Sequence, residues 1–145
     1  MTPYTPQDPD FATRVRDSFA KQAVMQSLGA EIAALEAGAI TLSMAHAPAY
    51  TQQDGFMHAG IISTVLDSAC GYAAFTLMPA DARVLTIEFK INLLRPANAE
   101  RYSFEARVTK AGRSITVCDG TAYGLNGGER KAIATMTGTL MAIGG

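Results

Sequence analysis

Residues 58–93 read HAGIISTVLDSACGYAAFTLMPADARVLTIEFKINL, and the spacing of the apolar residues changes at Pro79. From about Ala59 to Met78 the stretch is small and apolar, which predicts one long helix that Pro79 ends. From Leu85 to Leu93 apolar residues alternate with polar ones without a break, as in a half-buried strand. The centre of the chain is therefore predicted to be a long helix followed by a strand.

The flanking sequence adds a helix and more strands. Apolar residues recur at every fourth position near the N-terminus and predict a single amphipathic helix over 9–25, capped by Asp8 and followed by Gly29. Asn126-Gly127 is a strong hairpin signal. Short runs rich in strand-forming residues predict five further strands, over 32–35, 40–44, 101–108, 114–123 and 131–141.

This order of elements predicts an α+β fold. One long helix must cover one face of a largely antiparallel sheet. We expect residues 1–27 to form a lead-in and an extra N-terminal helix, and residues 28–145 to form one globular unit.

Composition excludes several classes of protein. The 145 residues are 48% hydrophobic, carry a net charge of −1 and contain no Lys/Arg run longer than a pair, so a nucleic-acid partner is not expected. The two cysteines lie in apolar stretches, which argues against a disulfide scaffold and a metal site. No signal sequence is visible, and polar residues interrupt the longest apolar stretch. We therefore expect a cytoplasmic protein that has no membrane contact.

Asp67 is the only charged residue between His58 and Met78. It belongs to a stripe of small or polar residues on the predicted helix, opposite an apolar stripe suited to packing on the sheet. A carboxylate is costly to bury without a partner, and a charge in an apolar helix often marks a functional site. A buried structural aspartate is the alternative, and we favour a functional one.

The start of the same helix is the second feature. Gly55, Ala59 and Gly60 keep bulky side chains away from the first turn, where backbone N–H groups lack partners inside the helix. Such an end can bind an anion or stabilise a developing oxyanion.

These residues form a recognisable pattern. Gln52-x-x-Gly55-x-x-His58-Ala59-Gly60-x6-Asp67 resembles the N/Q-x-x-G-x-x-H-G-G-x6-D/E signature of hotdog-fold acyl-CoA thioesterases of the PaaI-like, phenylacetate-pathway group. The likeness covers roughly residues 28–142. It implies a long central helix wrapped by an antiparallel sheet, with the N-terminal helix as an addition. It also implies an acyl-CoA substrate, no cofactor or metal, and homodimers with shared active sites that pair into tetramers.

The resemblance also assigns roles by position. Asp67 would be the nucleophile or general base, and the backbone N–H of Ala59, joined by that of Gly60, would hold the oxyanion. Gln52 would contact the thioester, and Thr86 would help to hold the attacking water. Two departures stand out, because Ala59 replaces the first Gly of the family triplet and Gln52 with Asp67 mixes two subtypes, which leaves the acyl preference open.

The remaining candidates have weaker signals. His58, at the helix entry, is expected to cap or pack and so to support the site. Arg95, Lys110 and Arg113 are candidates for contacts with coenzyme A phosphates, although basic residues are common at strand ends. The lone His46 is expected to be solvated, and Cys70 to be an inert packed thiol.

Two other functions compete with thioester hydrolysis. A hotdog hydratase or dehydratase needs a His/Asp or His/Glu acid–base pair, and neither histidine matches that motif. A non-catalytic acyl-CoA-binding or regulatory module is the second alternative, because Ala59 departs from the catalytic signature.

Overall fold

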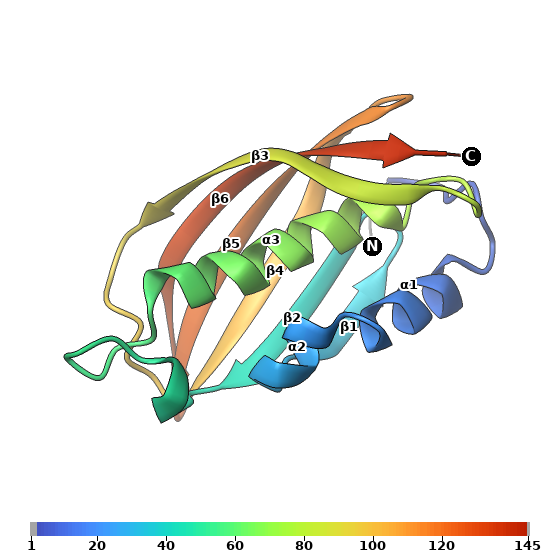
Figure 1. The fold of residues 1–145 in the computed structure, drawn as a ribbon. Helices are drawn as coiled ribbons and strands as arrows, with labels where there is room; N and C mark the ends of the chain where they lie inside the picture. Colours follow the sequence, from blue (N-terminus) through green and yellow to red (C-terminus); the bar gives the residue numbers. More distant parts are fainter. Residues whose placement is uncertain (1–2, 145) are drawn as a thin grey trace.

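A single long helix crosses the concave face of a six-stranded antiparallel sheet (Figure 1). The computed structural model describes residues 3–144, and the strand order in the sheet is β1-β2-β4-β5-β6-β3. The α+β prediction is confirmed. The elements are α1 (Phe11–Ala20), α2 (Ala23–Leu28), β1 (Glu31–Glu36), β2 (Ala39–Ala45), a 3-10 turn (Pro48–Tyr50), α3 (Ala59–Phe75), β3 (Arg83–Leu93), β4 (Arg101–Ala111), β5 (Ile115–Asn126) and β6 (Glu129–Ile143).

The inner face of α3 packs directly on the sheet. Leu66 and Cys70 are fully buried against β5, where a Cβ on Gly120 would lie 3.0 Å from Leu66 Cδ1 and 3.1 Å from Cys70 Sγ. A glycine in the strand therefore lets the helix approach closely. Each buried aliphatic side chain of this kind stabilises the fold by about 1.5–3 kcal/mol.

The prediction of one helix over 9–25 is wrong, because the segment folds as two helices. Gln22 interrupts it with an extended backbone, φ −81° and ψ 97°, and its side chain turns toward α3. Asp8 does not cap the helix, which begins at Phe11, and pairs with Arg14 instead at 2.9 Å. Arg14 donates to the carbonyl oxygens of Phe75 and Met78, so it fastens α1 to the end of α3.

The unbroken alternation predicted for β3 is also wrong. A β-bulge between Thr86 and Glu88 shifts the pairing with β6, so that Thr86 lies opposite Leu140 and Phe89 opposite Gly138. Thr86 and Phe89 therefore face the same side of the sheet as α3, although three positions separate them.

The outer edge of β3 is open and apolar. β3 pairs only with β6, and Leu85, Ile87, Phe89 and Leu93 on it are 42–57% exposed. In the view of Figure 1, α3 runs with β3 above it and α1 and α2 below it, and Ser63, Thr64, Asp67 and Ser68 on its open face are partly exposed. None of the helices within residues 3–144 is long and apolar enough to cross a membrane.

Candidate active site

Asp67 lies in the middle of α3, on its open face. Its carboxylate is half-buried and accepts a hydrogen bond from Thr86 Oγ1 to Oδ1 at 2.8 Å. Burial raises the pKa of Asp67, and the hydrogen bond from Thr86 partly lowers it. Among the described residues no basic side chain forms an ion pair with it. The site thus holds an uncompensated carboxylate with Oδ2 free to accept a proton.

His58 caps the N-terminus of α3, as expected. Its Nδ1 accepts a hydrogen bond from the Gly60 N–H at 2.8 Å. A Cβ on Gly60 would lie 3.0 Å from that nitrogen, so the glycine makes room for the cap. The Gly60 N–H is therefore engaged by His58, and in this structure the Ala59 N–H alone of the two is free for the predicted role of oxyanion donor.

Ala59 presents the free donor of the first turn. The N–H groups of Ile61 and Ile62 both donate to the His58 carbonyl oxygen. Within residues 3–144 the Ala59 N–H has no recorded partner. No described residue other than glycine has a positive φ, so Ala59 takes its place as the first helical residue without needing the conformational freedom of glycine.

Gln52 is held in a tight loop just before α3. Its Oε1 accepts from the backbone N–H of Asp54 at 2.6 Å and of Phe56 at 3.3 Å. Gly55, with φ +84°, provides the left-handed turn that closes this loop. The side-chain oxygen is thus occupied, and the amide NH2 remains available as a donor.

The predicted catalytic residues open into two separate hollows. A hollow of about 260 Å³ contains Asp67 and Thr86, and another of about 380 Å³ contains Gln52 and Ala59. Asp67 and Ala59 are eight residues apart, about 12 Å along the helix axis. Within one chain, Asp67 and the Ala59 N–H therefore do not lie within reach of a single carbonyl group.

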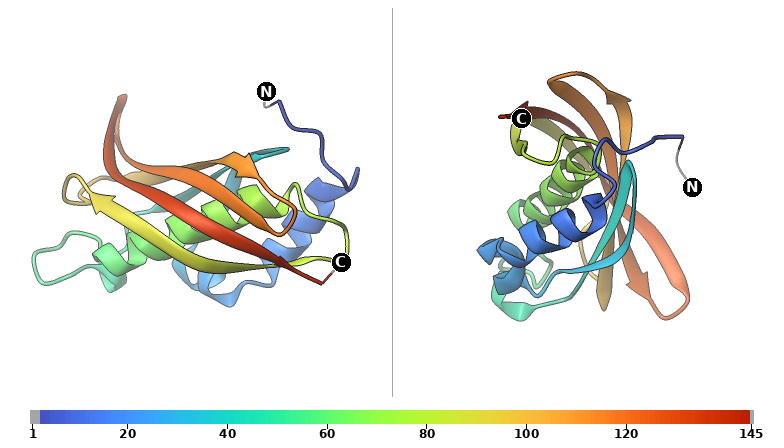
Figure 2. Two further views of the ribbon diagram at one scale, coloured as in Figure 1. Left: turned by 90° about the horizontal axis from the view of Figure 1, so that it is seen from above. Right: turned by 90° about the vertical axis from the view of Figure 1, so that its right-hand side faces the viewer.

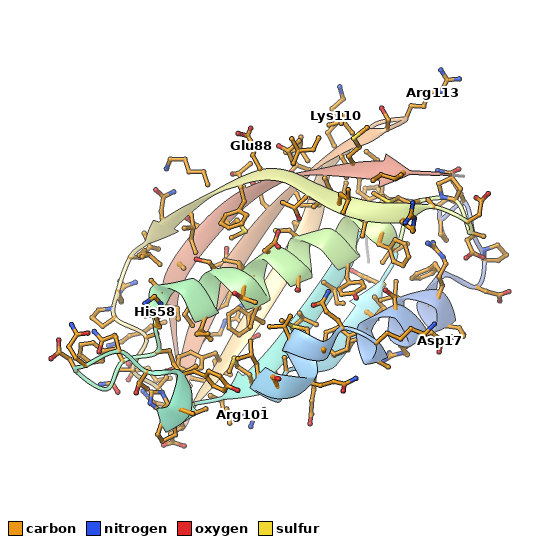
Figure 3. The ribbon with its side chains drawn as sticks, in the orientation of Figure 1. Asp17, His58, Glu88, Arg101, Lys110 and Arg113 are labelled. Atoms are coloured by element: carbon orange, nitrogen blue, oxygen red, sulfur yellow. The ribbon has the colours of Figure 1, made fainter. Side chains whose placement is uncertain are left out.

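The three predicted phosphate contacts do not cluster. Arg95 lines the hollow with Gln52 and Ala59, and its Nη1 donates to the Ala132 carbonyl oxygen at 2.6 Å. Lys110 and Arg113 lie at the β4–β5 hairpin, far from His58 (Figure 3). Only Arg95 is placed beside the candidate site of its own chain.

The prediction that His46 is merely solvated is wrong. Its Nδ1 lies 2.7 Å from the Tyr102 hydroxyl, which donates to the Ala97 carbonyl oxygen at 2.9 Å. The Met57 N–H donates to the same carbonyl at 3.0 Å. These bonds hold Met57 and Ala97, which both line the hollow beside Ala59. The only signal of them in the sequence was the position of Tyr102 among the apolar residues of its strand.

The sequence pattern did not predict that residues of the N-terminal helical segment line the hollow beside Asp67. Ser18 and Gln22 line the hollow of Asp67 together with Ser68 and Tyr72 of α3. The Tyr72 ring also contacts Phe19 of α1, at 5.7 Å between centroids. A polar Ser68 inside an apolar helix was the available signal.

The cysteines lie outside both hollows. Cys70 and Cys118 are fully buried, and burial raises the pKa of both thiols, that of Cys118 to about 12. Thiols of this kind stay protonated at neutral pH. The expectation of an inert Cys70 is confirmed.

Known proteins resemble the chain over most of its length. Residues 54–131 match the model of the thioesterase superfamily. A thioesterase family protein from Silicibacter pomeroyi is 59% identical, with a TM-score of 0.92 over 93% of this chain and 99% of that chain. A Saccharolobus solfataricus protein named "Putative esterase" is 30% identical over 77% of this chain and 73% of its own length. The Escherichia coli PaaI protein of the phenylacetic acid degradation operon shares the fold, at 20% identity and a TM-score of 0.85 over 94% of this chain and 95% of its own. The chain belongs to the thioesterase superfamily, and it is a thioester hydrolase with the PaaI type of hotdog fold.

Proposed function

We propose that the protein hydrolyses acyl-CoA thioesters to free acid and coenzyme A, at sites that two subunits share. The observation that carries the proposal is the distance along α3 between Asp67, which is paired with Thr86, and the free N–H of Ala59, which lines a different hollow. A reacting carbonyl must lie roughly 3 Å from both kinds of group. Two chains with opposed α3 helices satisfy that requirement.

The open edge of β3 supports this pairing. Its unpaired backbone and its exposed apolar side chains favour addition of a second β3 strand, antiparallel about a two-fold axis. The open faces of the two α3 helices would then oppose each other. Asp67 and Thr86 of each chain would face Ala59 and Gln52 of the other, and the resemblance further predicts that two such dimers form a tetramer.

The chemistry needs few groups. Asp67 either takes the proton of a water that attacks the thioester carbonyl or attacks the carbonyl itself to form an anhydride, which water then hydrolyses. The Thr86 hydroxyl orients the carboxylate by its hydrogen bond, and its oxygen helps to hold the attacking water. The Ala59 N–H stabilises the carbonyl oxygen as it becomes negative. The C–S bond then breaks and coenzyme A leaves as a thiolate, whose conjugate thiol has a pKa of roughly 8.5 by analogy with cysteine. A general acid is therefore not required.

Two further side chains have supporting roles in this proposal. The amide NH2 of Gln52 would donate to the thioester, since its oxygen is already engaged in the loop. Arg95, at the rim of the hollow beside Ala59, would meet a phosphate of coenzyme A.

The positions of the histidines argue against the hydratase alternative. His58 uses Nδ1 to cap α3, and His46 is bonded to Tyr102 in the loop support. Within one chain neither lies beside Asp67. Across a shared site His58 would adjoin Ala59, but its Nδ1 would still be engaged in the helix cap.

A thiol-release assay over short, medium, long and aryl acyl-CoAs tests the proposal. We expect turnover of at least one class, and we expect Asp67→Asn to lower kcat by at least about 100-fold, the lower range for loss of a general base. Asp17→Asn is the matched control, because Asp17 is exposed on α1 (Figure 3) and should leave kcat unchanged.

Three outcomes would contradict it. Tight binding of acyl-CoA without thiol release would identify a binding module. Hydration of an enoyl-CoA without thiol release would identify a hydratase. Turnover by folded Asp67→Asn at the wild-type rate would exclude Asp67 as the catalytic carboxylate.

A further inference from the structure

The hollow beside Asp67 continues past the carboxylate along α3. Asp67, Ser68, Gly71, Tyr72 and Phe75 of the helix form its floor. Residues at the start of β3 line one side, and Ser18 of α1 and Gln22, just before α2, line the other. The ribbon runs α3 between β3 and the α1–α2 segment (Figures 1 and 2). An acyl group attached to a carbonyl held near Asp67 has this groove directly in front of it.

A chain of hydrogen bonds joins Ser18 and Gln22, which form the polar wall of the groove, to α3. Ser68 Oγ donates to Gln22 Oε1 at 2.7 Å, which fixes the orientation of that amide. Gln22 Nε2 donates to the Tyr72 hydroxyl at 3.4 Å, and Ser18 Oγ lies 3.2 Å from the same hydroxyl. An amide NH2 has two donors, and only one of those on Gln22 is used. The wall therefore keeps a spare donor beside the groove.

Gly71 shows that the groove is kept open. A Cβ on Gly71 would meet no atom within 4 Å. Glycine in the middle of a helix is less stable than alanine by about 0.8–1.0 kcal/mol, so nothing in the packing of the chain itself favours it here. The volume of about 260 Å³ lies just below the range typical of drug-sized ligands. A small group fits this space.

We propose that Gln22, with Ser18, selects the acyl group, and that the preferred acyl group is short and carries a hydroxyl or carbonyl oxygen. This proposal rests on the thioesterase function proposed above. The apolar surfaces of Phe75 and Val84 hold the carbon skeleton, and Gln22 binds the oxygen. An acyl group without that oxygen leaves the polar wall desolvated and unpaired, so it binds less well.

The test compares kcat/KM for matched pairs of acyl-CoAs, butyryl with 4-hydroxybutyryl and benzoyl with 4-hydroxybenzoyl. The wild type is expected to favour the oxygenated member of at least one pair by about fivefold or more, the effect of one hydrogen bond. Gln22→Met, which has similar volume and no polar group, should abolish that preference. The Gln22 side chain makes no cap bond to α2, so the substitution removes no helix cap.

Two controls make the outcome decisive. Gln26→Met changes the same residue type on α2 at an exposed position outside the groove and should keep the preference. Tyr72→Phe should reduce it, since the hydroxyl that orients Gln22 and Ser18 is lost. If Gln22→Met does not fold, Tyr72→Phe carries the test.

Failure of this inference differs from failure of the proposed function. Hydrolysis of acyl-CoAs with no preference for the oxygenated members, or with a preference that Gln22→Met and Tyr72→Phe leave unchanged, overturns the role of the wall alone. Absence of thiol release from every acyl-CoA overturns the thioesterase proposal and this inference with it.

Discussion

Asp67 shows how the requirements of stability and of the proposed chemistry conflict at a single residue. Burial raises its pKa, so in the folded protein the carboxylate holds its proton more tightly than in the unfolded chain. The stability that comes from the protonated form is present at acid pH and is lost as pH rises through the pKa of the folded state. At neutral pH the ionised carboxylate therefore destabilises the fold.

We expect Asp67→Asn to melt at a higher temperature than the wild type at pH 7. Asparagine is uncharged and keeps an oxygen to accept the bond from Thr86. The gain should shrink as pH falls below the pKa of Asp67, where both side chains are neutral. Thermal melts of both proteins between pH 4 and 8 measure it, and a difference that grows at acid pH would contradict the stated sign.

Thr86 is expected to set the pH at which the site becomes active. Its hydroxyl lowers the pKa of Asp67, so Thr86→Val should raise that pKa further. The acid limb of the kcat profile should then move to higher pH, because the carboxylate form is the active one. Thr86→Ser should restore the wild-type profile. Equal acid limbs in all three proteins would show that the hydrogen bond does not act on the reacting carboxylate.

Ala59 offers a test of a single backbone N–H. Proline is accepted at the first position of a helix, and His58 before it already has the extended conformation that proline requires, with φ −59° and ψ 137°. Ala59→Pro should therefore fold, yet raise the barrier by about 2.7–4 kcal/mol, as for loss of a typical oxyanion donor. Ala59→Gly should stay active. Steady-state kinetics with far-UV circular dichroism decide it, and an active proline variant would place the oxyanion donor elsewhere.

At the level of elements, the spacing of apolar residues and the positions of proline and glycine predicted α3 and the four long strands β3 to β6 well. The split between α1 and α2 was not predictable, because the apolar spacing runs across it and the cause is tertiary, the bonds from Gln22 to α3. The bulge in β3 likewise depends on its pairing with β6. Both the break at Gln22 and the bulge in β3 depend on contacts between elements, which the local sequence pattern does not reveal.

Substitution of Gly71, in the middle of α3, tests helix stability and groove space separately. Gly71→Ala should stabilise the protein by about 0.8–1.0 kcal/mol, because alanine favours helix and its methyl group meets no atom. The same methyl should narrow the groove and lower kcat/KM for bulkier acyl groups. Denaturant melts and kinetics on one preparation test both effects. A variant that is stabilised with unchanged activity on every acyl-CoA would show that no acyl group passes over Gly71.

At the scale of the whole molecule, the sequence supplies candidate site residues, and how they could meet depends on the fold and on a second chain. The motif identified Asp67, Ala59 and Gln52, and helix geometry alone separated the first two. The engagement of the Gly60 N–H by His58 and the groove wall from α1 required three-dimensional contacts. The alternation in β3 predicted a half-buried strand, but its large apolar side chains are exposed in the single chain. This exposure is the clearest structural support for a second subunit at that edge.

Subunit mixing tests the shared site most directly. Asp67→Asn and Ala59→Pro, each inactive alone, are mixed under conditions that exchange subunits, and the exchange is confirmed by mass. About half of the dimers should be hybrids, each with one doubly altered site and one intact site, so activity should recover to about a quarter of the wild-type value. Exchange without any return of activity would place Asp67 and Ala59 in the site of the same chain and contradict the account.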